Sequence, residues 1–583
     1  MNLDFFAELK RRNVYKVAIA YAVVGWAIAE GVSQVFPVFD IPNWAARLII
    51  LLIVIGFPFA LIIAWAFEIT PEGIKRTEIA DAEHLPRRTR KRPWIYVVVI
   101  GALVAIGLLF FGRYLSSRQG GTEIPAKSIA VLPFVDLSQA HDQEYFCDGI
   151  SEEILDALAK VEGLRVVART SSFSFKGKNA DVSEIAQKLN VQNVLEGSLR
   201  REGNRIRITA QLVDAHNGFH IWSDTFEREM QGVFAVQDEI TRSIVDALKV
   251  KLAVTPSARA PENTEAYDLY LQGLYLSNKS DEESLRKSLN FFQRALDKDP
   301  RFARAWTGIA KAWLWLADAY VPPLEAYPTV KAAAAKAISL DEKDAEAHCY
   351  LGEAKRVLDF DPGGEEAEVK RALQLDPNSA FGHLFFASVL GVQWELDKAV
   401  AEMREAEKLD PLSPSVSSIS AIMYLATDRI NDAITEADRT VQLDPNYVYR
   451  DPILATAYRE KGDYEQAVAL YKKAQDATGA PQVGLAITYA KMGRQSDARQ
   501  ILDELKKLST TRYVAADLIA TIYVALDEKD EAFRWLERGL AQHAAVNYFI
   551  REFRPLRSDP RFADLLRRSG VDPAKALARQ KNP

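Results

Sequence analysis

The feature that most constrains this chain is a phrase repeated through its C-terminal half. Three copies, RALQLDPNSAFGH, EAEKLDPLSPSVS and RTVQLDPNYVYRD, place Pro377, Pro411 and Pro445 34 residues apart. A period of this length is typical of stacked helix pairs, in which each pair covers the apolar face of the next. The sequence therefore predicts an all-α solenoid over residues 264–545, with about eight helix pairs.

Within one repeat, small and large apolar residues alternate at the positions where paired helices meet. These residues are Leu454, Ala455, Tyr458, Ala467, Tyr471 and Ala474. The pattern resembles the tetratricopeptide repeat (TPR) family, which implies an extended inner surface that binds other proteins. The step from Pro300 to Glu342 is longer than one period and predicts an insertion around 321–323. Residues 546–583 are expected to cap the last repeat and form a tail.

Three apolar runs near the N-terminus predict membrane crossing. Residues 14–35, 47–67 and 94–112 each approach the roughly 20 apolar residues that span a bilayer core. The string FFAELKRRNVYKVAIAYAVVGW also resembles an anchoring module found at the start of bacterial TPR proteins. Residues 1–117 are therefore predicted to be a membrane anchor with three transmembrane helices.

The distribution of Lys and Arg sets the expected orientation. Basic residues cluster at 10–16 and at 75–92, whereas 36–46 carries no Lys or Arg. Because basic loops stay in the cytoplasm, we expect a multi-pass protein of the bacterial inner membrane. Its N-terminus would be cytoplasmic, and the residues after about 113 would be periplasmic.

The segment 128–255 predicts an α/β domain. SIAVLPF and LRVVAR read as strands, each followed by a helical stretch, which predicts parallel pairing. Turn signals at Glu202-Gly203 and Asn217-Gly218 then predict antiparallel hairpins. The strings SIAVLPFVDLS, VLEGSLRREGNRIRITAQLVDAHNGFHIWSDTFER and VFAVQDEIT resemble the TolB-like N-terminal domain. The predicted fold class is thus multi-domain: three transmembrane α-helices, then a TolB-like α/β domain, then an all-α TPR solenoid.

Residue patterns for catalysis or metal binding are weak. No phosphate-binding G-x-x-x-x-G-K-[ST] motif occurs. His216 and His220 flank a predicted turn, which argues against a shared metal, and Cys147 and Cys349 are too far apart in sequence to suggest a disulfide. Ser151 is expected to cap a helix rather than act as a nucleophile. We therefore predict no catalytic residues, no metal, no cofactor and no small-molecule substrate.

The overall charge is unfavourable for nucleic-acid binding. A net charge of −6 provides no basic excess to meet phosphates. The leading hypothesis is a membrane-anchored protein-interaction scaffold or sensor, not an enzyme, with the lipid bilayer and a protein as its partners. The alternative is a non-catalytic regulatory component of a nucleotide cyclase-type signalling system, because relatives of the TolB-like domain accompany such cyclases.

The repeat register predicts which side chains line the inner face of the solenoid. Inward positions of the first helix in each pair give a candidate partner-binding set: Arg304, Lys311, Glu346, Glu353, Arg356, Tyr449 and Arg459. Mixed charges with an aromatic suggest a polar peptide or protein segment as the ligand, since Tyr and Arg are frequent interface hot spots.

Overall fold

The computed structural model describes most of the chain from residue 127 onward and short stretches before it. The described residues are 21, 25, 51, 53, 55–61, 67–70, 73–76, 127–161, 163–230, 233–248, 263–279, 281–317, 319–447 and 449–581. The chain forms two compact units, Met1–Thr122 and Glu123–Pro583. In the first unit, β1 (Phe67–Thr70) and β2 (Gly73–Arg76) pair as an antiparallel hairpin.

The predicted membrane architecture is corrected. Within the described residues, no helix is long and apolar enough to cross a bilayer. The helical stretch 55–61 is far shorter than the roughly 20 residues that a crossing needs. This finding contradicts the fold class with three transmembrane helices and the multi-pass inner-membrane localisation. Most of 14–35 and 47–67, and all of 94–112, lie outside the described residues.

A mixed β-sheet opens the second unit. Its strands are β3 (Ser128–Val131), β4 (Val135–Asp136), β5 (Arg165–Val166), β6 (Asn193–Glu202), β7 (Arg205–Asp214) and β8 (His220–Glu229). The order is β5-β3-β6-β7-β8, with β4 also pairing β6. Pairs among β3, β4, β5 and β6 are parallel, whereas β6, β7 and β8 are antiparallel neighbours. The strand and helix alternation and the two hairpins are as predicted.

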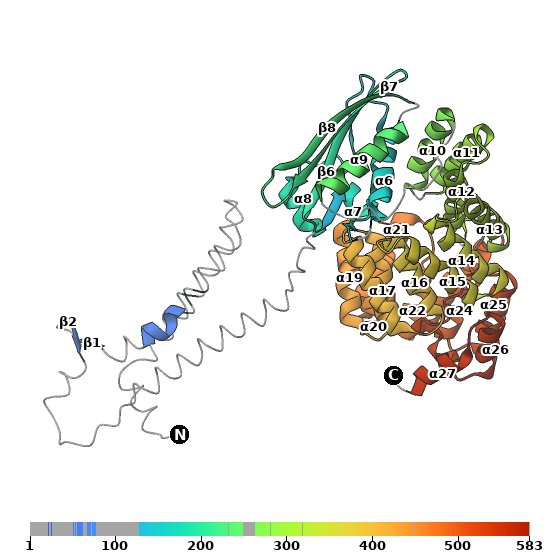
Figure 1. Ribbon diagram of the computed structural model, residues 1–583. Coiled ribbons are helices and arrows are strands. Elements are labelled where there is room, and N and C mark those ends of the chain that lie inside the picture. The colour runs from blue at the N-terminus through green and yellow to red at the C-terminus, as the bar shows by residue number, and fades with distance from the viewer. Residues whose placement is uncertain are drawn as a thin grey trace. The chain divides into compact units, whose positions relative to one another are not determined.

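Helices pack on both faces of this sheet (Figure 1). They are α6 (Glu144–Ala159), α7 (Arg169–Phe173), α8 (Val182–Leu189) and α9 (Val233–Ala247). Alternate residues of β3 explain the two layers: Ile129 belongs to the core with α6 and α9, and Ala130 to the core with α8. Asp181 caps α8 by accepting a hydrogen bond from the Ser183 amide.

Eight helix pairs follow over the described residues 263–541 and form the solenoid (Figure 1). The first helices of the pairs are α10 (Thr264–Ser277), α12 (Ala303–Leu316), α14 (Ala345–Asp359), α16 (Ala380–Val392), α18 (Pro414–Ala426), α20 (Arg450–Lys461), α22 (Val483–Lys491) and α24 (Ala516–Ala525). The second helices are α11 (Glu282–Lys298), α13 (Pro323–Leu340), α15 (Pro362–Leu375), α17 (Leu396–Leu409), α19 (Ile430–Leu443), α21 (Tyr464–Thr478), α23 (Gln495–Leu508) and α25 (Lys529–Ala541).

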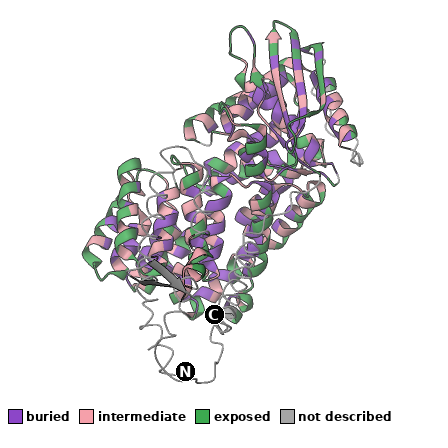
Figure 2. Cartoon of the chain, turned by 90° about the vertical axis from the view of Figure 1, so that its left-hand side faces the viewer, coloured by how far each residue is buried: buried purple, intermediate pink, exposed green. Residues whose placement is uncertain are grey.

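The repeat residues pack as their sizes suggest. Ala455 and Ala467 are 0% exposed, so α20 and α21 approach closely, and Tyr471 fills the space beside them at 2% exposed. The periodic prolines lie in the turns between pairs, and side chains such as Asp344 and Ser379 cap the following helices. Buried residues alternate with exposed and partly exposed ones along the helices of the array (Figure 2).

The chain ends in η4 (Arg551–Leu556), α26 (Pro560–Arg568) and α27 (Pro573–Lys581). Helix α26 contacts the last pair through ion pairs of Arg561 with Asp530 and of Arg568 with Glu537. The segment between α25 and α26 does more than cap, because it runs back onto earlier repeats.

Candidate functional site

The sheet domain and the start of the solenoid share one hydrophobic core. One buried cluster contains apolar residues of both parts, the first of them Ile129 in β3 and the last Val357 in α14. Helix α10 lies against α6 so closely that a methyl group on Gly149 would be 2.5 Å from Leu271 Cδ2. Tyr267 of α10 accepts a hydrogen bond of 2.8 Å from the Gln237 amide of α9. The first repeat therefore completes the sheet domain.

Polar contacts extend this attachment along α10 and α12. The Arg201 guanidinium pairs with Asp268 at 2.8 Å, and the Tyr145 hydroxyl donates to the same carboxylate at 2.9 Å. Burial, together with Asp268, raises the pKa of Tyr145, so this hydroxyl stays protonated. Glu153 of α6 forms an ion pair with Arg304 of α12.

A second set of contacts joins the sheet domain to the turn between α17 and α18. Asp410 accepts hydrogen bonds from the Ser171 amide at 3.0 Å and from the Ser171 hydroxyl at 2.5 Å. The Ser171 hydroxyl in turn accepts from the Leu412 amide at 2.7 Å. Burial raises the pKa of Asp410, and the hydrogen bonds from Ser171 reduce this increase without cancelling it. Asn378, in the turn between α15 and α16, donates hydrogen bonds to the carbonyls of Ala159 and Leu164 at 3.1 Å each.

The candidate partner-binding residues of the first repeats lie beside this attachment. Arg304 is engaged by Glu153, and Lys311 donates to the Asn278 amide oxygen at 2.7 Å. Glu346 keeps solvent-exposed surface, yet the surrounding protein desolvates its carboxylate and raises its pKa, while Lys311 opposes the shift. The structure thus brings Lys311 and Glu346 into electrostatic contact and places Arg304 under the sheet domain.

Glu353 and Arg356 belong to a buried ionic cluster. Arg356 pairs with Glu353, and its Nε lies 3.2 Å from Glu365, whose side chain is 1% exposed. Two carboxylates share one guanidinium, and burial raises the pKa of Glu365 well above its usual range. This arrangement supports a structural role for Glu353 and Arg356 within repeat three.

Arg459 is covered by the C-terminal segment. Its side chain is 1% exposed and pairs with Glu552 of η4 and with the adjacent Glu460. Arg551 Nε lies 3.0 Å from Glu460, and its guanidinium also pairs with Asp428. These partners are about 90 to 125 residues apart in sequence, so the segment lies against repeats five and six and is held there by charge-assisted bonds.

The same segment reaches repeats three and four through aromatic contacts. The His543 ring stacks on Phe360 with centroids 4.6 Å apart, and His543 Nδ1 lies 2.9 Å from the Val357 carbonyl oxygen. A Cβ on Gly391 would be 3.0 Å from the Phe549 ring, which is 2% exposed. Sequence reasoning missed this crossing, since only the aromatic-rich string NYFIREF marks it and carries no periodic signal.

Tyr449 is the accessible aromatic of the candidate set. Its side chain is 58% exposed at the start of α20, and its ring meets Tyr447 edge-on at 5.7 Å. Partial burial raises the pKa of Tyr320, and Tyr449 adds to the effect. Tyr320, next to the insertion around 321–323, is 43% exposed.

Other candidate groups have structural roles. Ser151 lies inside α6 rather than at its start, so the predicted cap is wrong: the helix begins seven residues earlier, and the hydroxyl bridges the Cys147 carbonyl and the Phe134 amide at 2.9 Å each. His216 and His220 flank the β7–β8 turn as expected. Cys147 and Cys349 are buried and unlinked. In the described part of the chain, no three His, Cys, Asp or Glu side chains gather as metal ligands.

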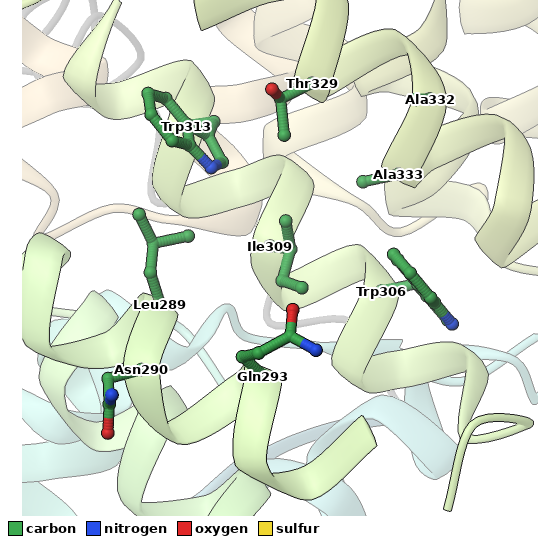
Figure 3. A pocket seen from close by; sticks show the side chains of 9 residues that line it. All are labelled: Leu289, Asn290, Gln293, Trp306, Ile309, Trp313, Thr329, Ala332 and Ala333. Carbon is green, nitrogen blue, oxygen red and sulfur yellow. The ribbon is translucent and has the colours of Figure 1, made fainter. Parts of the chain in front are cut away.

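A pocket of about 460 Å³ opens between α11, α12 and α13 (Figure 3). Its lining residues are Leu289, Asn290, Gln293, Trp306, Ile309, Trp313, Thr329, Ala332 and Ala333. Figure 3 shows Trp306, Ile309 and Trp313 rising from the central helix between side chains of the two flanking helices. The pocket was not anticipated, although the string KAAAAKA marks the position where α13 lacks large side chains.

Solved TPR-type structures match parts of the chain at low sequence identity. A solved TPR protein of Thermus thermophilus is 20% identical and matches 33% of this chain and 98% of its own, with a TM-score of 0.29. The pilus biogenesis factor PilW is 15% identical and matches 37% of this chain and 94% of its own, with a TM-score of 0.30.

The sheet domain matches a different family from the expected one. The family model described as HilA/YgeH-like transcriptional regulator, second domain, matches residues 125–244. The comparisons do not support the TolB-like resemblance.

Two curated relatives match parts of the chain. "Putative adenylate cyclase 3" of Rhizobium meliloti (strain 1021) is 43% identical over 193 residues, 32% of this chain and 33% of that protein. Superkiller protein 3 of Schizosaccharomyces pombe (strain 972 / ATCC 24843) is 25% identical over 253 residues, 40% of this chain and 17% of that protein. The chain thus spans a third or less of these relatives.

Proposed function

We propose that this chain is a protein-binding scaffold in which the sheet domain and the C-terminal segment hold a TPR solenoid in one curvature. The observation that carries the proposal is the exposure of Tyr449 at the start of α20, a helix whose other end is held by charges paired within the chain. At that other end, Arg459 pairs with Glu552 and Glu460 pairs with Arg551, which also pairs with Asp428. An aromatic that is 58% exposed on such a rigid framework can bury its surface against a partner at little entropic cost.

The seven candidate residues contribute differently under this proposal. Tyr449 is expected to contact the partner directly, with Lys311 and Glu346 as accessible charges near the inner face. Arg304, Glu353, Arg356 and Arg459 are expected to position the surface, because each is engaged by an oppositely charged or buried group of the chain. The ligand remains a polar protein segment, held by several modest contacts.

The test replaces Tyr449 with Ala and measures partner capture by crosslinking from cell extract. We expect loss of about tenfold in capture, because truncating an interface aromatic removes a hot spot. The matched control is Phe219→Ala, which removes an aromatic that is 73% exposed in the β7–β8 turn. Both variants should keep the wild-type melting temperature. Equal capture by wild type and Tyr449→Ala, with loss only in Phe219→Ala, would place the binding surface on the sheet domain.

A second candidate function is a non-catalytic regulatory component of a cyclase-type signalling system. The relative described as an adenylate cyclase, 43% identical over 193 residues, favours it. Under this proposal the purified chain makes no cyclic nucleotide from ATP with Mg²⁺ or Mn²⁺, but changes the rate of a cyclase that copurifies with it. Cyclic AMP formation that tracks the purified chain would contradict the non-catalytic role.

A further inference from the structure

The pocket between α11, α12 and α13 faces away from the predicted inner face. Arg304 and Lys311 are seven residues apart on α12 and share one side of it. Trp306 and Trp313 are also seven residues apart. Each follows Arg304 or Lys311 by two residues, so the two Trp side chains point about 200° away from Arg304 and Lys311 around the α12 axis. The other walls come from α11 and α13, the second helices of their pairs. The pocket is therefore a surface separate from the one around Tyr449.

The pocket exists because α13 carries small side chains where α12 carries large ones. Ala332 and Ala333 form its wall opposite Ile309, so the two indole side chains have no bulky neighbour on that side (Figure 3). Trp306 and Trp313 both remain partly exposed. The Trp306 Nε1 donates to the Pro300 carbonyl at 3.3 Å, which fixes that ring at one end of the pocket.

Polar groups at the pocket mouth suit a single side chain with one hydrogen-bonding atom. Among the described residues, the Asn290 amide and the Thr329 hydroxyl form no hydrogen bond within the chain. Gln293 is engaged by Asp297 at 3.1 Å. A volume of about 460 Å³ with aromatic walls and two open polar groups fits an indole or phenol ring better than a charged group.

The charges beside the pocket favour an acidic partner. Arg294 and Lys336 follow Asn290 and Ala332 by one helical turn on α11 and α13, and both are exposed. Asp297 is an acidic residue at the same end, and its carboxylate already accepts a hydrogen bond from the Gln293 side-chain amide. In the described part of the chain, neither Arg294 nor Lys336 has an ion-pair partner; the Arg294 guanidinium lies over the Phe291 ring at 5.4 Å. One end of the pocket therefore carries net positive charge.

We propose that this pocket is a second docking site, which receives a Trp or Tyr side chain from an amphipathic helix of a protein partner, with acidic residues of that helix facing Arg294 and Lys336. Helices α11 and α13 flank the pocket on either side, so a helix of the partner can lie along them. The aromatic ring enters between Trp306 and Trp313, and its polar atom meets Asn290 or Thr329.

The experiment measures binding of a defined probe to the full chain by fluorescence polarisation. The probe is a fluorescein-labelled, alanine-rich helical peptide with one central Trp and two Glu residues one and two turns from it. Two further peptides replace the Trp with Ala or both Glu with Lys. We expect saturable binding of the first peptide, and binding at least about tenfold weaker for each of the others.

The decisive variant fills the pocket without removing any contact. Ala332→Leu places a larger side chain into the space between the indoles, and Leu is about as favourable as Ala in a helix. The matched control is Ala335→Leu, an exposed alanine of the same run in α13 that does not line the pocket. We expect Ala332→Leu to weaken probe binding about tenfold or more, and Ala335→Leu to change it less than about twofold.

A charge variant keeps the proposal testable if Ala332→Leu does not fold. Lys336→Glu changes an exposed side chain outside the core, and should weaken the acidic probe while strengthening the probe with Lys in place of Glu. Tyr449→Ala should leave probe binding unchanged, so failure of this proposal and failure of the inner-face function are distinguishable.

Three results would overturn the docking site. These are the absence of saturable binding to the wild-type chain, equal binding by wild type and Ala332→Leu, and equal losses in Ala332→Leu and Ala335→Leu. Binding of free indole that Ala332→Leu abolishes, without binding of any peptide, would also overturn it and assign the pocket to a small aromatic molecule.

Discussion

Replacing Gly149 with Ala tests whether the sheet domain and the solenoid are one mechanical body. The added methyl would lie 2.5 Å from Leu271 Cδ2 and 3.2 Å from Leu271 Cγ, and Leu271 is 0% exposed, so neither helix can yield freely. Overpacking of this kind costs about 1–3 kcal/mol, whereas removing a helical glycine returns about 0.5–1 kcal/mol. We expect the free energy of unfolding to fall by about 1–2 kcal/mol.

The partner change is Leu271→Ala, which should cost about 2–5 kcal/mol on its own because it leaves a cavity. In that background the methyl on Gly149 enters free space, so Gly149→Ala should cost nothing or stabilise by up to about 1 kcal/mol. The coupling between the two sites is then about 1–3 kcal/mol, measured as a double-mutant cycle by urea unfolding followed with circular dichroism.

Gly539→Ala provides the control within the solenoid. This glycine also lies in a helix, but an added Cβ would meet its nearest neighbour at an ordinary 3.6 Å. Its effect should add to that of Leu271→Ala without coupling. Additive effects for the pair of Gly149 and Leu271 would refute the shared core and would imply that α6 and α10 separate before either domain unfolds.

Three shorter predictions concern buried polar groups. Burial raises the pKa of Asp517 to about 6, so the native protein binds this proton more tightly than the unfolded chain does, and the free energy of unfolding should fall by up to about 2 kcal/mol as the pH rises from about 4 to 6. The variant Asp517→Asn should lack that fall in unfolding curves measured over the same pH range. Burial alone would raise the pKa of Glu460, but Arg459 and neighbouring cations outweigh burial and lower this pKa to about 2, so the stabilisation that the carboxylate gives the folded state should be lost as the pH falls from about 4.5 to 2. The variant Glu460→Gln should therefore lower the melting temperature at pH 7 but not at pH 2. Ser171→Ala leaves Asp410 without its hydroxyl donor and should cost about 1–3 kcal/mol, read by denaturant unfolding at neutral pH; an unchanged midpoint would show that water replaces the bond.

The repeats could be predicted from sequence because their signal is local and periodic. Pro377, Pro411 and Pro445 set the register, and the alanines and tyrosines between them follow from the steric demands of close helix pairs. The hairpins around Gly203 and Gly218 were predictable for a similar reason, since both glycines adopt positive φ in the turns.

Contacts between distant segments could not be predicted in this way. Neither Glu153 with Arg304 nor Arg551 with Glu460 has a spacing that marks it, because the curvature of the stacked pairs decides which turns meet. The prediction of inner-face residues rests on helical periodicity, which gives the side of a helix but not what covers that side. The apolar runs near the N-terminus, the basic loops and the resemblance to an anchoring module likewise predict a membrane architecture, which the helices of the described residues contradict.

The return of the C-terminal segment onto repeats three to six has a consequence for how this array can evolve. Open solenoids lengthen or shorten by whole repeats, because each unit needs only its neighbours. Here His543 must reach Phe360 while Arg551 reaches Asp428, and Gly570, with φ of 78°, must fit beneath the Phe360 carbonyl. Inserting or deleting one helix pair between α18 and α25 would shift all three contacts at once. Natural variation in this protein should therefore appear as substitutions and loop changes, with the number of repeats held constant.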